Sequence, residues 1–113
     1  MLIKVIIIED ELFIILHLSK LVKSLGFDVV GKYHNAEDFL KDTDWNFDIA
    51  LVDIFLSGTL TGFDAAIEIK KRQKPFVFLT ANKDTETINN AAKLAPAAYL
   101  NKPFQHSEVE AAL

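Results

Sequence analysis

The amino-acid sequence predicts a single α/β domain with a doubly wound, five-stranded parallel sheet and helices on both faces. Short apolar runs alternate with helix-like segments five times along the chain. The first run is rich in β-branched residues and lacks alternating polar positions, which is typical of a parallel strand buried on both faces. Right-handed crossovers between such strands place helices on the two faces of the sheet. The 113 residues suffice for one such domain and are too few for two.

The strands are predicted from their apolar content and from the residues that bound them. The first run ends in three acidic residues, and Pro75 opens a run that ends at Thr80. The last run is the weakest of the five. The expected strands cover residues 3–8, 27–30, 48–54, 76–80 and 97–100.

The helices are predicted from capping residues and from apolar spacing. Gly26 has the position of a C′ residue that ends the first helix, and Asn35 caps the second helix with Asp38 at N3. Asp84 is the candidate N-cap of the fourth helix. These four helices are expected at residues 11–25, 35–41, 62–72 and 84–94. Their expected core faces include Ile14, Leu18, Leu21, Val22 and Leu25 on the first helix and Phe63, Ala66, Ile67 and Ile69 on the third.

A last, short helix is predicted from a capping box. Ser107 and Glu110 have the spacing in which a cap side chain and a residue three positions on satisfy each other's backbone groups. A helix with so few residues before the sequence ends buries little. We therefore expect it to be truncated, with a natural chain that continues.

The composition bears on the class of protein. The chain is 50% hydrophobic and 25% charged, the profile of a soluble globular protein, and its net charge of −4 argues against direct nucleic-acid binding. It contains no cysteine, so neither disulfides nor thiolate metal sites can form. No segment approaches the ~18 apolar residues of a membrane span, and the apolar start lacks the features of a secretory signal. We expect a cytoplasmic protein without membrane insertion.

Polar residues stand at the carboxyl ends of the expected strands. Glu9 and Asp10 follow the first strand, Asp53 ends the third, Thr80 ends the fourth and Lys102 follows the fifth. In open parallel sheets, ligands bind outside these strand ends. Three carboxylates that meet there repel one another unless a divalent cation and an ammonium group balance them. Oxygen ligands of this kind suit Mg²⁺.

The sequence resembles the receiver domain of bacterial two-component response regulators over essentially its whole length. The resemblance implies the flavodoxin-like strand order 2-1-3-4-5. Each matching segment is a weak signal alone, but their order and spacing at the strand ends form a strong one. The segments are Ile7-Ile8-Glu9-Asp10-Glu11, Leu51-Val52-Asp53-Ile54, Phe78-Leu79-Thr80-Ala81 and Tyr99-Leu100-Asn101-Lys102-Pro103-Phe104.

The resemblance implies that Asp53 is the phosphoacceptor of a Mg²⁺-dependent reaction. Asp10 would bind the metal directly and Glu9 would hold it through water. Asp53 and the backbone carbonyl of Phe55 would complete the protein ligands, and Mn²⁺ could replace Mg²⁺.

Three further residues have implied roles around the phosphoryl group. The Thr80 hydroxyl would contact the phosphoryl oxygens, and Lys102 would pair with the acceptor and then with the phosphoryl group. Tyr99 would be an aromatic switch whose ring moves with Thr80. For Tyr99, an ordinary strand residue half in the core is the alternative.

The implied function is a phosphorylation-controlled signalling switch. A sensor histidine kinase or a histidine phosphotransfer protein would donate the phosphoryl group to Asp53, and the modified domain would regulate a downstream partner or output domain. Homodimerisation on phosphorylation is a further expectation. Such a receiver speeds its own phosphotransfer and autodephosphorylation but is not a turnover enzyme. These residues contain no output domain.

Three other classes of protein are weighed against this function. A flavodoxin-like electron carrier needs a phosphate-binding loop after the first strand, where this chain has acids at 9–11. An Asp-nucleophile phosphatase needs a second acid where Phe55 stands. An interaction module that needs no phosphorylation is disfavoured by the complete set of Asp10, Asp53, Thr80 and Lys102.

The sequence departs from the common receiver pattern after the acceptor. Ser57 replaces a frequent proline, and the loop from there to Gly62 looks one residue longer than the commonest version. Phe55 and Asn82 flank the expected phosphoryl position. Phe55 is bulky and apolar, so we expect it to impede the attacking water and to lengthen the lifetime of the acyl phosphate.

The first helix carries more apolar residues than its core face requires. Leu12, Phe13 and Leu16 fall on the side that Lys20 and Lys23 share. A cluster of exposed apolar side chains beside a polar site is typical of a partner contact. Two occupants remain open, namely the phosphodonor protein and a C-terminal segment beyond residue 113.

Overall fold

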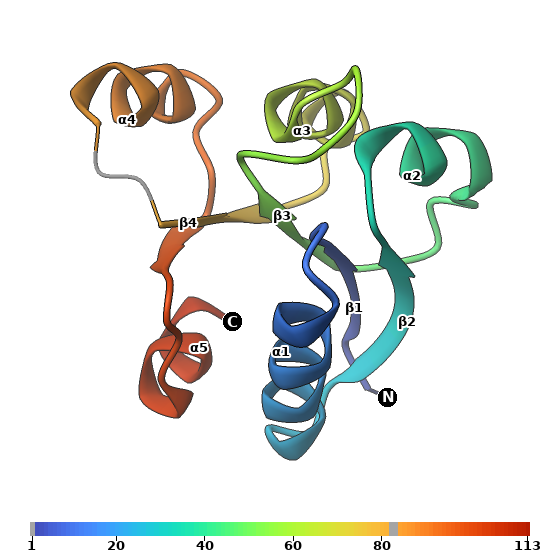
Figure 1. Ribbon diagram of the computed structural model, residues 1–113. Coiled ribbons are helices and arrows are strands. Elements are labelled where there is room, and N and C mark those ends of the chain that lie inside the picture. Colours follow the sequence, from blue (N-terminus) through green and yellow to red (C-terminus); the bar gives the residue numbers. More distant parts are fainter. Residues whose placement is uncertain (1, 82–83) are drawn as a thin grey trace.

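The computed structural model describes residues 2–81 and 84–113. Five parallel strands form one sheet in the order β2-β1-β3-β4-β5, as predicted. The strands are β1 (Lys4–Ile8), β2 (Asp28–Tyr33), β3 (Ile49–Asp53), β4 (Phe76–Thr80) and β5 (Ala98–Asn101). The helices are α1 (Leu12–Ser24), α2 (Ala36–Asp42), α3 (Gly62–Lys71), α4 (Thr85–Ala92) and α5 (His106–Ala112). Helices α1 and α5 cover one face of the sheet, and α2, α3 and α4 cover the other (Figure 1).

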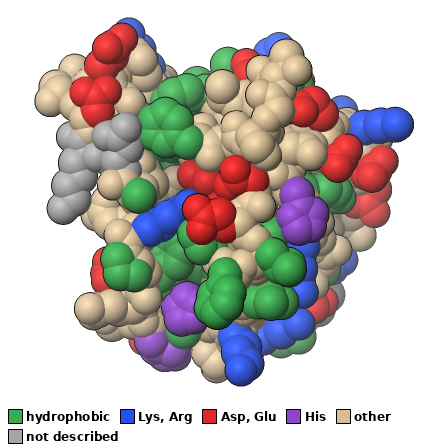
Figure 2. Space-filling view, viewed as in Figure 1, with side chains coloured by type: hydrophobic (Ala, Val, Ile, Leu, Met, Phe, Trp, Pro, Cys, Tyr) green, Lys and Arg blue, Asp and Glu red, His purple; other side chains and the backbone are tan. Residues whose placement is uncertain are grey.

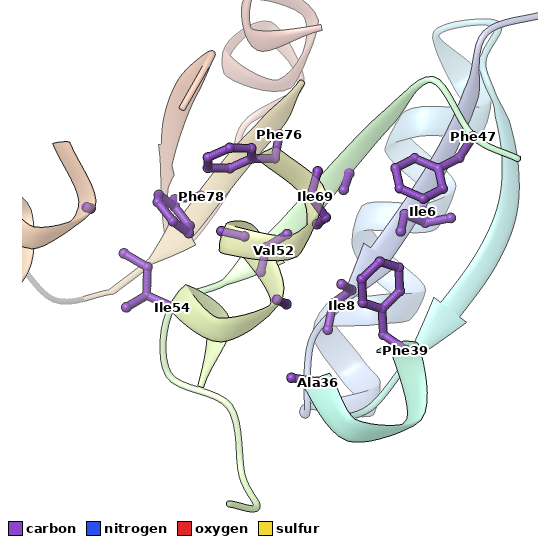
Figure 3. Close-up of a cluster of buried hydrophobic side chains, with 14 residues drawn as sticks. Ile6, Ile8, Ala36, Phe39, Phe47, Val52, Ile54, Ile69, Phe76 and Phe78 are labelled. Atoms are coloured by element: carbon purple, nitrogen blue, oxygen red, sulfur yellow. The ribbon is translucent and has the colours of Figure 1, made fainter. Parts of the chain in front are cut away.

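The core consists of two layers, one on each face of the sheet. Alternation along β1 sends Ile6 and Ile8 into one layer and Val5 and Ile7 into the other, so both faces of this strand are buried. Figure 3 shows the first layer, where the side chains of Phe39 and other residues lie between the sheet and its covering helices. The second layer lies under α1 and α5. The first strand is continuously apolar because both of its faces are buried, as the sequence predicted.

Strand β2 is longer than predicted. It runs to Tyr33, and the expected end at Val30 is wrong. The register with β1 shifts between Val5 and Ile6, after which pairing continues to Ile8 and Tyr33. Gly31 and the polar Lys32 do not resemble strand residues, so the sequence prediction ended too early. An edge strand can stay hydrogen-bonded with half of its residues exposed.

Two predicted helix faces are confirmed in part, because Leu18 and Val22 on α1 and Ala66 and Ile69 on α3 are buried as predicted. On α1 the buried residues are Ile15, Leu18, Ser19 and Val22, whereas Ile14 is only partly buried. On α3, Ile67 is exposed and Ala65 is buried in its place. Positions 14 and 15 are both apolar, so the sequence permits either rotation of α1. The fit of the larger side chains against the sheet decides between them.

Of the predicted helix caps, those at Gly26 and Asn35 are confirmed and the capping box at Ser107 is wrong. Gly26 has a φ of 92° after α1, and Asn35 Oδ1 accepts from the Asp38 N–H at 2.8 Å, so both of these caps are confirmed. The capping box at Ser107 and Glu110 is wrong, because Gln105 is the N-cap of α5 and Ser107 lies inside the helix.

Core packing explains where α5 begins. Phe104 and Val109 are buried in the same layer as α1, and they fix the start of the helix. Their burial outweighs a cap that is worth about 1 kcal/mol.

Among residues 2–81 and 84–113, no helix is both long and apolar enough to cross a membrane.

Candidate functional site

The polar residues singled out in the sequence meet at one edge of the sheet. Glu9 and Asp10 follow β1, Asp53 is the last residue of β3, Thr80 is the last residue of β4, and Lys102 follows β5. Parallel pairing aligns these strand ends, with Asp53 opposite Leu79 on the neighbouring strand β4. Figure 2 shows acidic side chains beside a basic one near the middle of this view.

The three acidic residues form a compact group. One carboxylate oxygen from each of Glu9, Asp10 and Asp53 lies within 4.8 Å of the others. Glu9 is completely buried and Asp53 is 4% exposed, whereas Asp10 is partly exposed. Backbone N–H groups orient two of them, since Glu11 donates to Glu9 Oε1 and Phe55 donates to Asp53 Oδ1, each at 3.2 Å. The group therefore has the donor atoms and the access from Asp10 that a divalent cation requires.

Lys102 supplies one positive charge to two of these carboxylates. Its Nζ lies 2.7 Å from Glu9 Oε2 and 3.2 Å from Asp53 Oδ2. The contact with Asp53 is a hydrogen bond, and the shorter contact with Glu9 joins an ammonium to a carboxylate. Among the described residues, Lys102 is the one partner of the buried Glu9 Oε2. This leaves acceptor capacity that a metal-bound water would use.

The electrostatics of the group show that one ammonium does not balance it. Burial raises the pKa of Glu9 from 4.5 to about 7, and the nearby charge of Asp53 adds to this effect against the opposing influence of Lys102. Burial also raises the pKa of Asp53, although Lys102 opposes that shift. Burial lowers the pKa of Lys102, but the two carboxylates together raise it above its ordinary value. The site therefore favours binding of either a proton or a cation.

Thr80 and Tyr99 lie on adjacent strands. Thr80 is 5% exposed, and its carbonyl accepts from the Lys102 N–H at 3.0 Å, which ties the Lys102 backbone to the end of β4. Tyr99 is 40% exposed, and its ring centroid is 6.4 Å from that of Phe78 on β4. The Tyr99 ring is thus partly exposed and lies beside a ring of β4. Asn82 lies outside the described residues.

The exposed apolar residues of α1 lie where the sequence predicts. Leu12, Phe13 and Leu16 are 60%, 86% and 55% exposed. Phe13 borders two open hollows, and we call these three residues with both hollows the α1 surface. One hollow, of about 490 Å³, is lined by Phe13, Leu16, His17, Ser19, Lys20, Lys23 and Lys32. The other, of about 350 Å³, is lined by Phe13, Ile14, His17, Lys102, Pro103 and Phe104, so it reaches the site itself.

Two features near the site were missed by the sequence prediction, namely a close contact of Gly62 and a capping box of Thr61 and Asp64. Gly62 begins α3 with its Cα against the Asp53 backbone, so that a Cβ there would overlap the Asp53 carbonyl oxygen. Thr61 and Asp64 form a complete capping box beside it. Their spacing is visible in the sequence as a signal for the start of this helix. The contact of Gly62 with Asp53 has no such signal, because it depends on how α3 crosses the end of β3.

A parallel sheet in this order, with buried acids and a lysine at its carboxyl edge, defines the class of CheY-like receiver domains. The chain belongs to the response regulator receiver domain family, whose model matches residues 5–113. Such domains act in phosphorylation-dependent signalling, generally bind Mg²⁺ in an acidic pocket and receive their phosphoryl group from histidine kinases. They are generally not turnover enzymes.

Individual relatives agree with the family assignment. Transcriptional regulatory protein PdtaR of Mycobacterium tuberculosis is 31% identical over 108 residues, which are 94% of this chain and 52% of that protein. Chemotaxis protein CheY of Thermotoga maritima is 27% identical over 97% of this chain and 93% of its own length. The signal receiver domain of a modulated diguanylate cyclase from Desulfovibrio desulfuricans has a TM-score of 0.92 and 34% identity, covering 99% of this chain and 90% of that one. The chain spans about half the length of several curated relatives, PdtaR among them.

Proposed function

We propose that Asp53 accepts a phosphoryl group from a phosphohistidine of a sensor histidine kinase or histidine phosphotransfer protein. The observation that carries this proposal is the burial of Asp53 beside Glu9, Asp10 and Lys102. In the transfer, a carboxylate oxygen of Asp53 bonds to phosphorus while the bond between phosphorus and the donor imidazole breaks. The imidazole nitrogen keeps the electron pair. The domain promotes this reaction and later hydrolysis of its own acyl phosphate, without acting as a turnover enzyme.

The acidic group fits a bound Mg²⁺, or Mn²⁺ in its place. Asp10 and Asp53 would bind the metal directly, Glu9 through water, and Phe55 through its backbone carbonyl. When bound, the ion neutralises charge on the phosphoryl oxygens. The completely buried Glu9, whose Oε2 has Lys102 as its one partner among the described residues, supports this fit.

Phosphorylation would act through Lys102, Thr80 and Tyr99. A phosphoryl group carries a charge of about −1.5 to −2, which attracts the Lys102 ammonium and the Thr80 hydroxyl. Movement of Thr80 at the end of β4 changes the space beside Tyr99 on β5, whose partly exposed ring can follow it. The altered surface would then regulate a downstream partner or an output domain, with homodimerisation as one form of this regulation.

The direct test is phosphorylation by a small phosphodonor with Mg²⁺. The expected result is a mass gain of one phosphoryl group, measured on the intact protein. Asp53→Asn removes the acceptor carboxylate and should abolish the gain. Wild-type protein that stays unmodified, under conditions that label other receivers, would refute the proposal.

Replacement of Phe55 by asparagine is expected to speed autodephosphorylation. The Phe55 side chain is 52% exposed beside the acceptor, where its bulk restricts an attacking water. An amide there would orient the water instead. We expect a rate increase of roughly tenfold, which corresponds to about 1.4 kcal/mol of barrier. Loss of the phosphoryl group from purified, phosphorylated protein measures this rate, and an unchanged rate contradicts the prediction.

The α1 surface is proposed to dock the phosphodonor protein rather than a further segment of this chain. Phe13→Asp should raise the KM for a donor protein by roughly tenfold, as expected when an apolar anchor is lost from an interface. Transfer from a small phosphodonor should not change. Ile67→Asp alters an exposed apolar residue on α3 and serves as the control. An equal KM for Phe13→Asp and wild type would favour the alternative occupant.

A further inference from the structure

The loop between β3 and α3, residues 54–61, is held by a hydrogen bond that no sequence motif predicts. The Leu60 N–H donates to Glu37 Oε1 at 2.9 Å, and Glu37 lies in the first turn of α2. Within residues 2–81 and 84–113, this is the only hydrogen bond that joins the loop to a helix other than α3. This is the loop that looks one residue longer than the commonest receiver version, with Ser57 where a proline is frequent.

A second contact involves the same carboxylate. Gly58 has a φ of 105°, and a Cβ on it would lie 3.2 Å from Glu37 Cδ and 3.3 Å from Oε1. The Glu37 carboxylate therefore rests against the bare Cα of Gly58 while it accepts from Leu60. Glycine allows both the left-handed backbone and this close approach. The two contacts fix the far half of the loop to α2.

The near half of the loop leads into the site. Phe55 follows the acceptor by two residues, and its N–H donates to Asp53 Oδ1. The loop is closed at its base, where Gly62 N–H donates to the Ile54 carbonyl at 3.1 Å. Between that closure and Leu60, no described residue donates to or accepts from the backbone of residues 56–59. Leu56 and Leu60 pack against the first core layer, and the hydrogen bond to Glu37 is the polar contact that fixes the far half of the loop.

We infer that Glu37 is a positioning residue, which holds the loop of residues 54–61 so that the Phe55 carbonyl is available to the metal site. This inference rests on the proposed function for the role of that carbonyl. A loop that contains Gly58 and no proline has many conformations to lose on folding. A carboxylate that accepts a backbone N–H offsets this cost, because hydrogen bonds to charged groups are among the stronger ones.

Three variants separate this role from a general weakening of α2. Glu37→Ala removes the acceptor, and Glu37→Gln keeps an oxygen at Oε1. Asp38→Ala removes a carboxylate from the same turn that contacts Asn35 and not the loop. For each, we would measure exchange of the Leu60 amide, the Kd for Mg²⁺ by calorimetry and the midpoint of thermal unfolding.

The expected results are specific to the loop. Glu37→Ala should speed exchange of the Leu60 amide about tenfold and weaken Mg²⁺ binding severalfold. Glu37→Gln should restore both values, and Asp38→Ala should change only the thermal midpoint. Unchanged exchange or unchanged Mg²⁺ affinity in Glu37→Ala overturns the inference, as does an equal loss of affinity in Asp38→Ala or no rescue by Glu37→Gln. Wild-type protein that binds no Mg²⁺ would instead refute the proposed function.

Discussion

Replacement of Gly62 by alanine is expected to destabilise the domain and to displace its acceptor. The new Cβ would overlap the Asp53 carbonyl oxygen and lie 2.8 Å from both the carbonyl carbon of Asp53 and Ile54 Cα. These are backbone atoms of β3, so no side-chain rotation relieves the overlap. Alanine would gain up to about 1 kcal/mol in helix propensity. Overpacking against backbone costs roughly 1–3 kcal/mol and sometimes more, so we expect a net loss of about 2 kcal/mol or more.

Urea denaturation measures the loss for Gly62→Ala, and the Kd for Mg²⁺ reports the displacement of Asp53. Gly26→Ala is the matched control, because a Cβ there meets no atom within 4 Å but the φ of 92° is unfavourable for alanine. It should cost about 1–2 kcal/mol and leave Mg²⁺ binding unchanged. A Gly62→Ala protein as stable as wild type, with the same Kd, would show that β3 and α3 move apart freely.

The metal-free domain is expected to lose stability between about pH 5 and pH 8, mainly because of Glu9. Burial raises the pKa of Glu9 from 4.5 to about 7, so the folded state binds this proton more tightly than the unfolded state. The stabilisation is complete below the unfolded pKa and is lost as the pH rises through 7. A difference of that size corresponds to roughly 3 kcal/mol. The raised pKa of Asp53 acts in the same direction.

Glu9→Gln tests this assignment, because it removes the ionisable group and keeps the shape of the side chain. Without metal, the variant should be more stable than wild type at pH 8 and nearly equal to it at pH 5, as measured by urea denaturation. Glu11→Gln, at an exposed neighbouring position, should show the wild-type pH dependence. Mg²⁺ should restore wild-type stability at pH 8, because it binds the ionised folded state. A wild-type protein whose stability is flat across this range contradicts the prediction.

Much of the site could be predicted because strand ends in a parallel sheet are aligned by topology. Once β1, β3, β4 and β5 are recognised, Asp10, Asp53, Thr80 and Lys102 must fall at one edge. Their roles in phosphoryl transfer stay predictions until they are tested chemically. The same logic does not reach contacts between helices and loops, such as that of Glu37 with Leu60, since no periodicity relates those two positions.

The errors on α1, α3 and α5 have a common physical cause. Each concerns a place where tertiary packing chose between locally equivalent options, such as Ile14 or Ile15 on α1. Ser107 is similar, because a good capping residue gave way to the burial of Val109. Local signals rank such options only within about 1 kcal/mol, whereas a buried side chain contributes roughly 1.5–3 kcal/mol.

The ion pair between Glu9 and Lys102 has a consequence for folding as well as for chemistry. It joins the end of the interior strand β1 to the residue after the edge strand β5, so nearly the whole length of the chain separates its partners. Contacts of such long range form late, because chain entropy opposes them until the intervening strands have paired. Partly folded molecules therefore lack the acidic pocket. Titration of a sample with Mg²⁺ is therefore expected to count its completely folded molecules.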